Sequence, residues 1–88
     1  MNNESILKAK EISHHYTNIA SIEVCAFDFK INFGIASQVN GTTDTNIEYN
    51  NQVIMSPQHA KALLYALQEN ITQYETIFGN INIDPKKE

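Results

Sequence analysis

The stretch that decides the fold reads Val53-Ile-Met-Ser-Pro-Gln-His-Ala-Lys-Ala-Leu-Leu-Tyr-Ala-Leu-Gln-Glu-Asn-Ile-Thr-Gln-Tyr-Glu-Thr-Ile-Phe-Gly79. Ser56 is a favoured N-cap residue, and Pro57 suits the first helical position, where an N–H group is not needed. Gly79 follows the last apolar residue, where helices commonly end in a left-handed cap. The stretch therefore predicts the end of a strand and then one helix from Pro57 to Phe78, roughly 33 Å long at the standard rise per residue.

The predicted helix is amphipathic. Its apolar residues recur at steps of three and four, which places them on one face. They are Ala60, Leu63, Leu64, Leu67, Ile71, Tyr74 and Phe78. A helix with such a face must bury it against another element, which the preceding sequence has to supply.

Two segments before the helix alternate apolar and polar residues, as strands do when one face is buried. The clearer one places Phe27, Phe29, Ile31, Phe33 and Ile35 on one face. The earlier one, within residues 16–24, alternates Ala20, Ile22 and Val24 with polar residues, and Cys25-Ala26 predicts a bend between the two.

Asn40-Gly41 is a strong hairpin signal that predicts a third strand before the helix. A two-residue turn would place Glu48 opposite Phe33, and so a charge on the apolar face. A three-residue loop over 40–42 instead pairs Ile35 with Ile47, Phe33 with Tyr49, Phe29 with Val53 and Phe27 with Met55. Because neighbouring residues face opposite sides, we expect this odd-length loop, or an even one corrected by a bulge within residues 46–51.

The predicted fold is α+β: a three-stranded antiparallel meander covered on one face by one long C-terminal helix. Residues 16–81 form the single domain, 1–15 a flexible N-terminal arm, and 82–88 a frayed tail. Eighty-eight residues lie near the lower limit for a self-sufficient core, so the chain is expected to form homo-oligomers.

Composition excludes several classes of function. A net charge of −4, with six lysines and no arginine, disfavours binding to nucleic acid or to anionic membranes. The sequence holds no transmembrane run and no apolar N-terminal signal segment, which predicts a cytoplasmic protein. One cysteine, Cys25, excludes an internal disulfide framework.

No catalytic, metal or cofactor site is predicted. His14 and His15 are adjacent on an extended segment and would point in opposite directions, without a third ligand nearby. His59 lies in the first helical turn with no nucleophile placed beside it, and Cys25 has no basic neighbour in the sequence to activate it. The chain is therefore not expected to be an enzyme.

Two blocks of the sequence resemble a family of small uncharacterised bacterial and archaeal proteins, a conserved domain of unknown function. They cover about residues 16–81. The second block is the more specific: Val53-Ile54-Met55-Ser56-Pro57, His59-Ala60-Lys61, Leu63-Leu64, Leu67, Asn70, Tyr74-Glu75 and Phe78-Gly79. Gln52 stands where that family usually has a basic residue. The resemblance implies an antiparallel α/β fold and oligomers, and the layout also has a looser likeness to the export chaperone SecB.

The outer stripe of the helix is the predicted recognition surface, because an exposed tyrosine favours interfaces and the family resemblance includes Lys61 and Glu75. This outer stripe consists of Lys61, Tyr65, Gln68, Thr72 and Glu75. We therefore expect a non-catalytic protein-binding adaptor, with a chaperone-like role as a variant, that binds itself and another polypeptide. The alternatives are a dimeric nucleic-acid-binding regulator and a small-ligand binder with a site between subunits.

Overall fold

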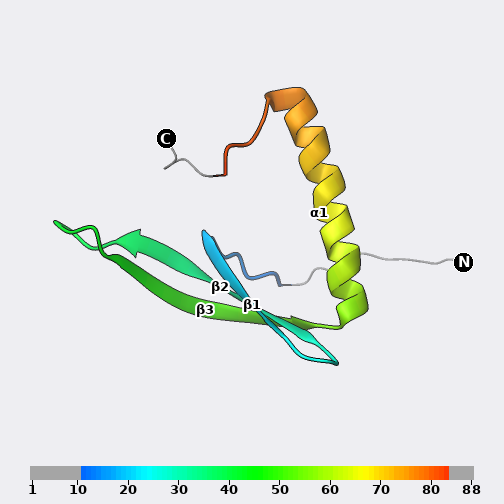
Figure 1. The fold of residues 1–88 in the computed structure, drawn as a ribbon, viewed down its shortest axis with the longest axis horizontal. Helices are drawn as coiled ribbons and strands as arrows, with labels where there is room; N and C mark the ends of the chain where they lie inside the picture. Colours follow the sequence, from blue (N-terminus) through cyan, green and yellow to red (C-terminus); the bar gives the residue numbers. More distant parts are fainter. Residues whose placement is uncertain (1–10, 84–88) are drawn as a thin grey trace, which may run out of the picture.

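The computed structural model describes residues 11–83, which form a three-stranded sheet and one helix (Figure 1). The strands are β1 (Ile19–Val24), β2 (Phe29–Gln38) and β3 (Thr45–Met55), and the helix is α1 (Pro57–Phe78). The sheet is antiparallel in the order β1-β2-β3, a meander. This confirms the predicted α+β class, strand order and helix boundaries. Residues 1–10 of the predicted arm at 1–15 and residues 84–88 of the predicted tail at 82–88 lie outside the described residues.

Both ends of α1 are capped by the residues that the sequence predicts, but Gly79, with a ψ of 169°, lies outside the left-handed helical region. The Oγ of Ser56 accepts a hydrogen bond from the backbone N–H of His59 at 3.1 Å, and Pro57 opens the helix. At the other end Gly79 has a φ of 103°, and its N–H donates to the carbonyl of Glu75 at 3.0 Å. Glycine carries no Cβ, so it adopts this positive φ without the strain that other residues would incur.

The β2–β3 hairpin follows the second of the two predicted alternatives. Its loop holds an even number of residues, since Gln38 pairs with Thr45, and a β-bulge corrects the register between Phe33 and Gly34. Phe33 is opposite Asn51 and Gly34 is opposite Tyr49, which leaves Asn50 as the extra residue. The bulge lies within the segment where the sequence requires one, because only a shift by one residue returns apolar side chains to one face.

Several predicted pairs are wrong as a consequence of that register. Ile35 is opposite Glu48 rather than Ile47, and Phe29 is opposite Met55 rather than Val53. Phe27 belongs to the bend between β1 and β2 and is 87% exposed, so it is neither a strand residue nor part of a core. The bend is longer than the two residues expected, because β2 begins only at Phe29.

Gly34 lies at the closest backbone approach in the sheet. A Cβ built there would come within 2.7 Å of the Cα of Tyr49 and closer still to the carbonyl oxygen of Glu48. Side-chain carbon atoms do not pack that close to backbone, so the bulge requires a residue without a side chain at this position.

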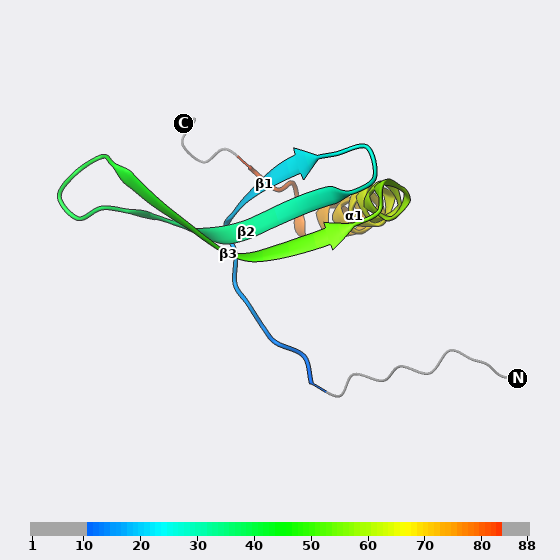
Figure 2. The ribbon, with the colours of Figure 1, turned by 90° about the horizontal axis from the view of Figure 1, so that it is seen from below.

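The bulge divides the sheet into two parts (Figure 2). β1 pairs with β2 only from Phe29 to Gly34, so the described sheet has three strands on one side of the bulge. Beyond the bulge β2 and β3 continue alone as a two-stranded hairpin that points away from α1 (Figure 2).

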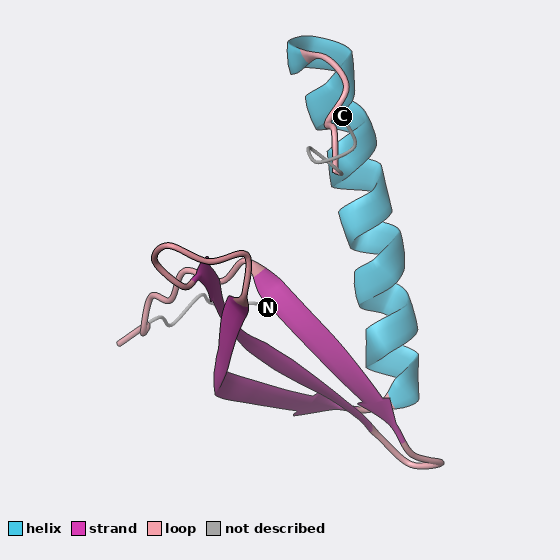
Figure 3. Cartoon of the chain, turned by 60° about the vertical axis from the view of Figure 1, so that its left-hand side comes forward, coloured by secondary structure: helices cyan, strands magenta, loops and turns pink. Residues whose placement is uncertain are grey.

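The helix faces the sheet without packing tightly against it. α1 starts directly after β3 and diverges from the plane of the sheet along its length (Figure 3). No hydrophobic side chain among the described residues is buried, and no residue of α1 is. The close cover of the sheet expected from the sequence is therefore looser in the structure, and within residues 11–83 the chain has no closed hydrophobic core.

Candidate binding surface

An apolar groove separates the first half of α1 from the sheet. Its volume is about 600 Å³. The sheet contributes Ile22, Phe29 and Ile31, and the helix contributes Pro57, Ala60, Lys61, Leu63, Leu64 and Leu67. Ile22 is opposite Ile31 in the β1–β2 register, so these side chains share the face that the alternation predicted to be apolar. Apart from Pro57 and Lys61, the groove is built from residues that the sequence analysis placed on the apolar faces of the strands and the helix.

The second half of α1 also carries apolar side chains, and these are exposed. Ile71 is 45% exposed and Phe78 is 70% exposed. The rings of Tyr74 and Phe78 pack on each other, with centroids 4.8 Å apart and planes at 43°. This aromatic pair forms a continuous apolar surface beyond the end of the groove.

The residues of the outer stripe occupy three different settings. Tyr65 is 57% exposed and Gln68 is also exposed. The hydroxyl of Thr72 donates to the carbonyl of Gln68 at 3.0 Å, one turn earlier in the helix. Lys61 lines the rim of the apolar groove, which the sequence analysis did not foresee.

Glu75 has a structural role in the C-terminal turn. Its carboxylate accepts a hydrogen bond from the backbone N–H of Ile81 at 3.0 Å, while its carbonyl accepts the N–H of Gly79. This side chain is half-buried, unlike the other four members of the outer stripe. The structure therefore brings Tyr65, Gln68 and Thr72 together on the exposed side of α1 and places Lys61 and Glu75 towards its two ends.

The opposite face of the sheet carries a polar network centred on Asn32. The side-chain N–H groups of Asn32 donate to Ser21 Oγ at 3.2 Å and to Glu23 Oε2 at 2.9 Å, and its oxygen accepts from Gln52 Nε2 at 2.7 Å. The network joins all three strands. Sequence reasoning noted Gln52 only as a departure from the family pattern, whereas the cross-strand register explains its place.

The side chains of Thr17 and Asn18, which precede β1, extend the hydrogen bonding between β1 and β2. The amide of Asn18 makes two hydrogen bonds with the backbone of Ala36, at 2.7 and 3.1 Å. The hydroxyl of Thr17 bonds with the N–H and the carbonyl of Gly34. The edge of β2 is therefore covered on that side, whereas β3 runs the full length of the hairpin as an edge strand of the described sheet. Polar residues before a strand are the only signal for these contacts in the sequence.

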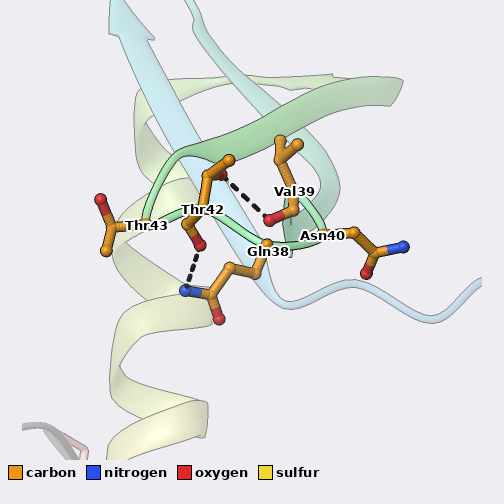
Figure 4. Close-up of a pocket in the computed structure, with 6 residues that line it drawn as sticks. Gln38, Val39, Asn40, Thr42 and Thr43 are labelled. Atoms are coloured by element: carbon orange, nitrogen blue, oxygen red, sulfur yellow. Dashed lines mark hydrogen bonds between the residues drawn. The ribbon is translucent and has the colours of Figure 1, made fainter.

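The hairpin loop closes on itself and encloses only a shallow hollow. Thr42 donates to the carbonyl of Val39 through both its N–H and its hydroxyl, and Gln38 donates to the carbonyl of Thr42 at 3.3 Å (Figure 4). Gly41 supplies the positive φ of 73° that the turn needs. The hollow is lined by this one loop and by no charged side chain.

The histidines and the cysteine that were considered for a catalytic or metal site lie apart from one another. His14 and His15 are exposed outside the strands, Cys25 is exposed in the β1–β2 bend, and His59 is exposed in the first turn of α1. Within residues 11–83 no three histidine, cysteine or carboxylate side chains are grouped in a way that could hold a metal ion. In the same residues, no helix is long and apolar enough to cross a membrane.

These features belong to a family without an assigned activity. Residues 2–83 match the family described as Protein of unknown function (DUF3467), and the chain belongs to that family. This confirms the resemblance to a conserved domain of unknown function. No curated protein and no solved structure matches the chain.

Proposed function

We propose that the chain is a subunit of a homo-oligomeric, non-catalytic protein-binding module, an adaptor in the sense that it joins itself to another polypeptide. One observation carries the proposal. Residues 11–83 form regular strands and a helix, but none of their hydrophobic side chains is buried. Apolar surface on this scale marks contact with other polypeptide chains in a soluble protein. The apolar groove serves self-association, and a second surface serves the partner.

The partner surface consists of the outer edge of β3 and the exposed residues of the outer stripe. An unpaired strand edge offers a row of backbone donors and acceptors to an extended polypeptide, and the 11 residues of β3 provide a long one. Tyr65 adds an exposed aromatic side chain of the type that anchors protein interfaces. Binding through these elements needs neither a cofactor nor a metal.

Support for the nucleic-acid alternative is weaker. The described residues hold two lysines, Lys30 and Lys61, on different elements. Lys30 is opposite Glu23 in the register of β1 and β2, which offsets its charge. Phosphate recognition needs several cations on one surface, and these residues supply no such group.

The experiment is native mass spectrometry of the tagged chain purified gently from its own host. Wild-type protein is expected as an oligomer that retains a stoichiometric second polypeptide. Tyr65→Ala should lose that polypeptide and keep the oligomer. Tyr16→Ala, which removes another exposed tyrosine outside the strands and the helix, should retain both. Oligomers of this chain alone in all three samples would contradict the adaptor role.

The chaperone-like variant is tested separately by suppression of aggregation of an unfolded model protein. If the module binds unfolded chains, substoichiometric amounts should delay light scattering, and Tyr65→Ala should reduce the delay. An unchanged aggregation curve at equimolar amounts would exclude this variant while leaving a specific partner open to the first experiment.

A further inference from the structure

Six of the seven residues of the apolar face of α1, all except Leu63, form an apolar stripe with a heptad spacing. From Ala60 the residues recur in alternating steps of four and three, which is the spacing of the a and d positions of a coiled coil. They are Ala60, Leu64, Leu67, Ile71, Tyr74 and Phe78. The a and d residues alone form a seam of the width that a second helix covers, and Leu63 and Ile77 widen the apolar face beside it.

The stripe is also symmetric about position 69. If two α1 helices cross there in opposite directions, Leu67 of one lies against Ile71 of the other. Leu64 then meets Tyr74, and the small Ala60 meets the large Phe78. Each layer joins an a position to a d position. The central layers join two aliphatic side chains of equal size, and the outer layers join a smaller side chain to an aromatic one.

We propose that a second copy of this chain occupies the apolar groove, through an antiparallel pair of α1 helices related by a two-fold axis at position 69. The second half of each helix, with Tyr74 and Phe78, enters the groove between the sheet and the first half of the other helix. This inference rests on the self-association stated in the proposed function and names the partner and the geometry.

The charges flanking the stripe are complementary in this arrangement. Lys61 and Glu75 both follow d positions, and in the antiparallel pair each Lys61 lies close to Glu75 of the second copy. On the same side of the helix pair, Gln68 of one chain lies next to Gln68 of the other chain at the two-fold axis. On the other side Asn70 meets its own copy, and Leu63 meets Ile77, which is 70% exposed in the single chain. A parallel pair would instead place Tyr74 against Tyr74 and leave Phe78 outside the groove.

The apolar side chains along α1 supply the surface that such a dimer would cover. Leu64, Leu67 and Ile71 are 56%, 52% and 45% exposed, and Tyr74 and Phe78 are 49% and 70% exposed. A stable interface buries about 800 Å² on each partner.

The proposal also divides the outer stripe by role. Lys61, Gln68 and Glu75 lie along the seam between the two helices. Tyr65 and Thr72 occupy b positions, next to the e positions of that seam but further from the second helix, where they stay exposed in the dimer. The dimer contact and the partner surface of the proposed function are therefore compatible on the same helix.

Disulfide cross-linking tests the geometry directly. In a Cys25→Ser background, Asn70→Cys places a thiol next to its copy across the two-fold axis. The adjacent Glu69→Cys points outward and is the matched control, and Ile71→Cys meets its copy only in a parallel pair. Under mild oxidation Asn70→Cys should form covalent dimers, and the other two variants should stay reducible monomers on denaturing gels.

A charge exchange tests the same axis without a new covalent bond. Lys61→Glu and Glu75→Lys should each weaken the homodimer by roughly tenfold, because two like-charge contacts replace two favourable ones. Mixing the two variants should restore wild-type affinity in the heterodimer. The heterodimer has lost the bond between Glu75 and Ile81 in one chain and the Lys61→Glu homodimer has lost it in neither, so recovery relative to the Lys61→Glu homodimer cannot come from this bond.

The outcomes separate this proposal from the proposed function. Cross-linking of Ile71→Cys, or of Glu69→Cys as efficiently as Asn70→Cys, would overturn the antiparallel pair. So would an oligomer, measured by light scattering, that none of the three cysteines cross-links. In those cases the proposed self-association and adaptor role would remain, and the contact between copies would lie on another face of the molecule. A wild-type monomer would overturn both.

Discussion

In the sheet, polar groups find their partners within the chain: Asn32 bonds to both neighbouring strands, and Asn18 continues the strand edge with its side chain. In α1 the backbone groups at the two ends are also hydrogen-bonded, because Ser56 and Gly79 cap the helix. Its apolar side chains, however, remain exposed, including the whole second half of the stripe. The comparison teaches that the sheet satisfies these side-chain hydrogen bonds within the chain, whereas the single chain leaves most of the apolar side chains of α1 exposed.

The largest effect is expected where a charge enters the helix pair. Ile71→Asp places a carboxylate at a central layer of the dimer, twice per dimer because of the two-fold axis. An unpaired buried charge costs several kcal/mol, so the dissociation constant should rise by about a thousandfold or more. Sedimentation equilibrium of the variant and the wild type measures this change.

Gln73→Asp is the matched control for that substitution, because it adds the same charge to an exposed position of the same helix turn. Surface substitutions of this kind usually change stability by less than about 0.5 kcal/mol. Equal dissociation constants for the two variants would show that the apolar stripe of α1 is an ordinary solvated face.

The next effect concerns the sheet alone. Gly34→Ala introduces a methyl group where the carbonyl of Glu48 already lies, so the bulge must open. The free energy of unfolding should fall by about 3 kcal/mol, the upper range for overpacking against atoms that cannot move aside. Urea unfolding at a fixed protein concentration measures it.

Gly41→Ala provides the comparison for Gly34. Its Cβ would have no atom within 4 Å, although φ is +73°. The loss should be about 1 kcal/mol, the conformational cost of a left-handed alanine. A larger loss for Gly41→Ala than for Gly34→Ala would contradict the bulge as described.

A smaller loss is expected for Asn32→Ala, about 1 kcal/mol, because its partners on the exposed face regain hydrogen bonds from water. Asn46→Ala, an exposed position of β3, is the control and should change little. Both variants should keep the dissociation constant of the wild type, since this network lies on the face away from the groove. A weakened dimer in Asn32→Ala would place the interface on the polar face.

The smallest expected change is Ser56→Ala, which removes the hydrogen bond to the N–H of His59. Loss of an N-cap costs about 1 kcal/mol at most in an exposed helix that is stabilised elsewhere. Circular dichroism should show a slightly lower melting temperature with unchanged helicity at low temperature. A loss of helical signal in the folded protein would show that α1 depends on its cap rather than on packing.

The helix and the bulge could be predicted because local residues determine them. Ser56, Pro57 and Gly79 mark the ends of α1 chemically, and the conflict between an even loop and one-sided burial demands a bulge within 46–51. Phe27 could not be placed, because alternation alone does not show where a strand begins. The register beyond the bulge likewise depends on how many loop residues the turn uses, which Asn40-Gly41 does not determine.

For the candidate surface, the sequence indicated which residues are apolar but not what covers them. The groove forms because of the direction in which α1 leaves β3, and no single residue determines that direction. The contacts of Thr17 and Asn18 with β2 are non-local hydrogen bonds, whose partners are far apart in the sequence. Glu75 was predicted as a recognition residue from the family resemblance, whereas in the structure it holds the turn after α1.

The most direct test of the central claim is thermal unfolding, followed by circular dichroism, across a wide range of protein concentrations. If the apolar surface is buried only between chains, folding and association are coupled. The melting temperature then rises with concentration, and each tenfold increase adds about 1.4 kcal/mol to the apparent stability of the dimer. A cooperative transition at the same temperature at every concentration would show that the single chain is stable by itself and would contradict the account.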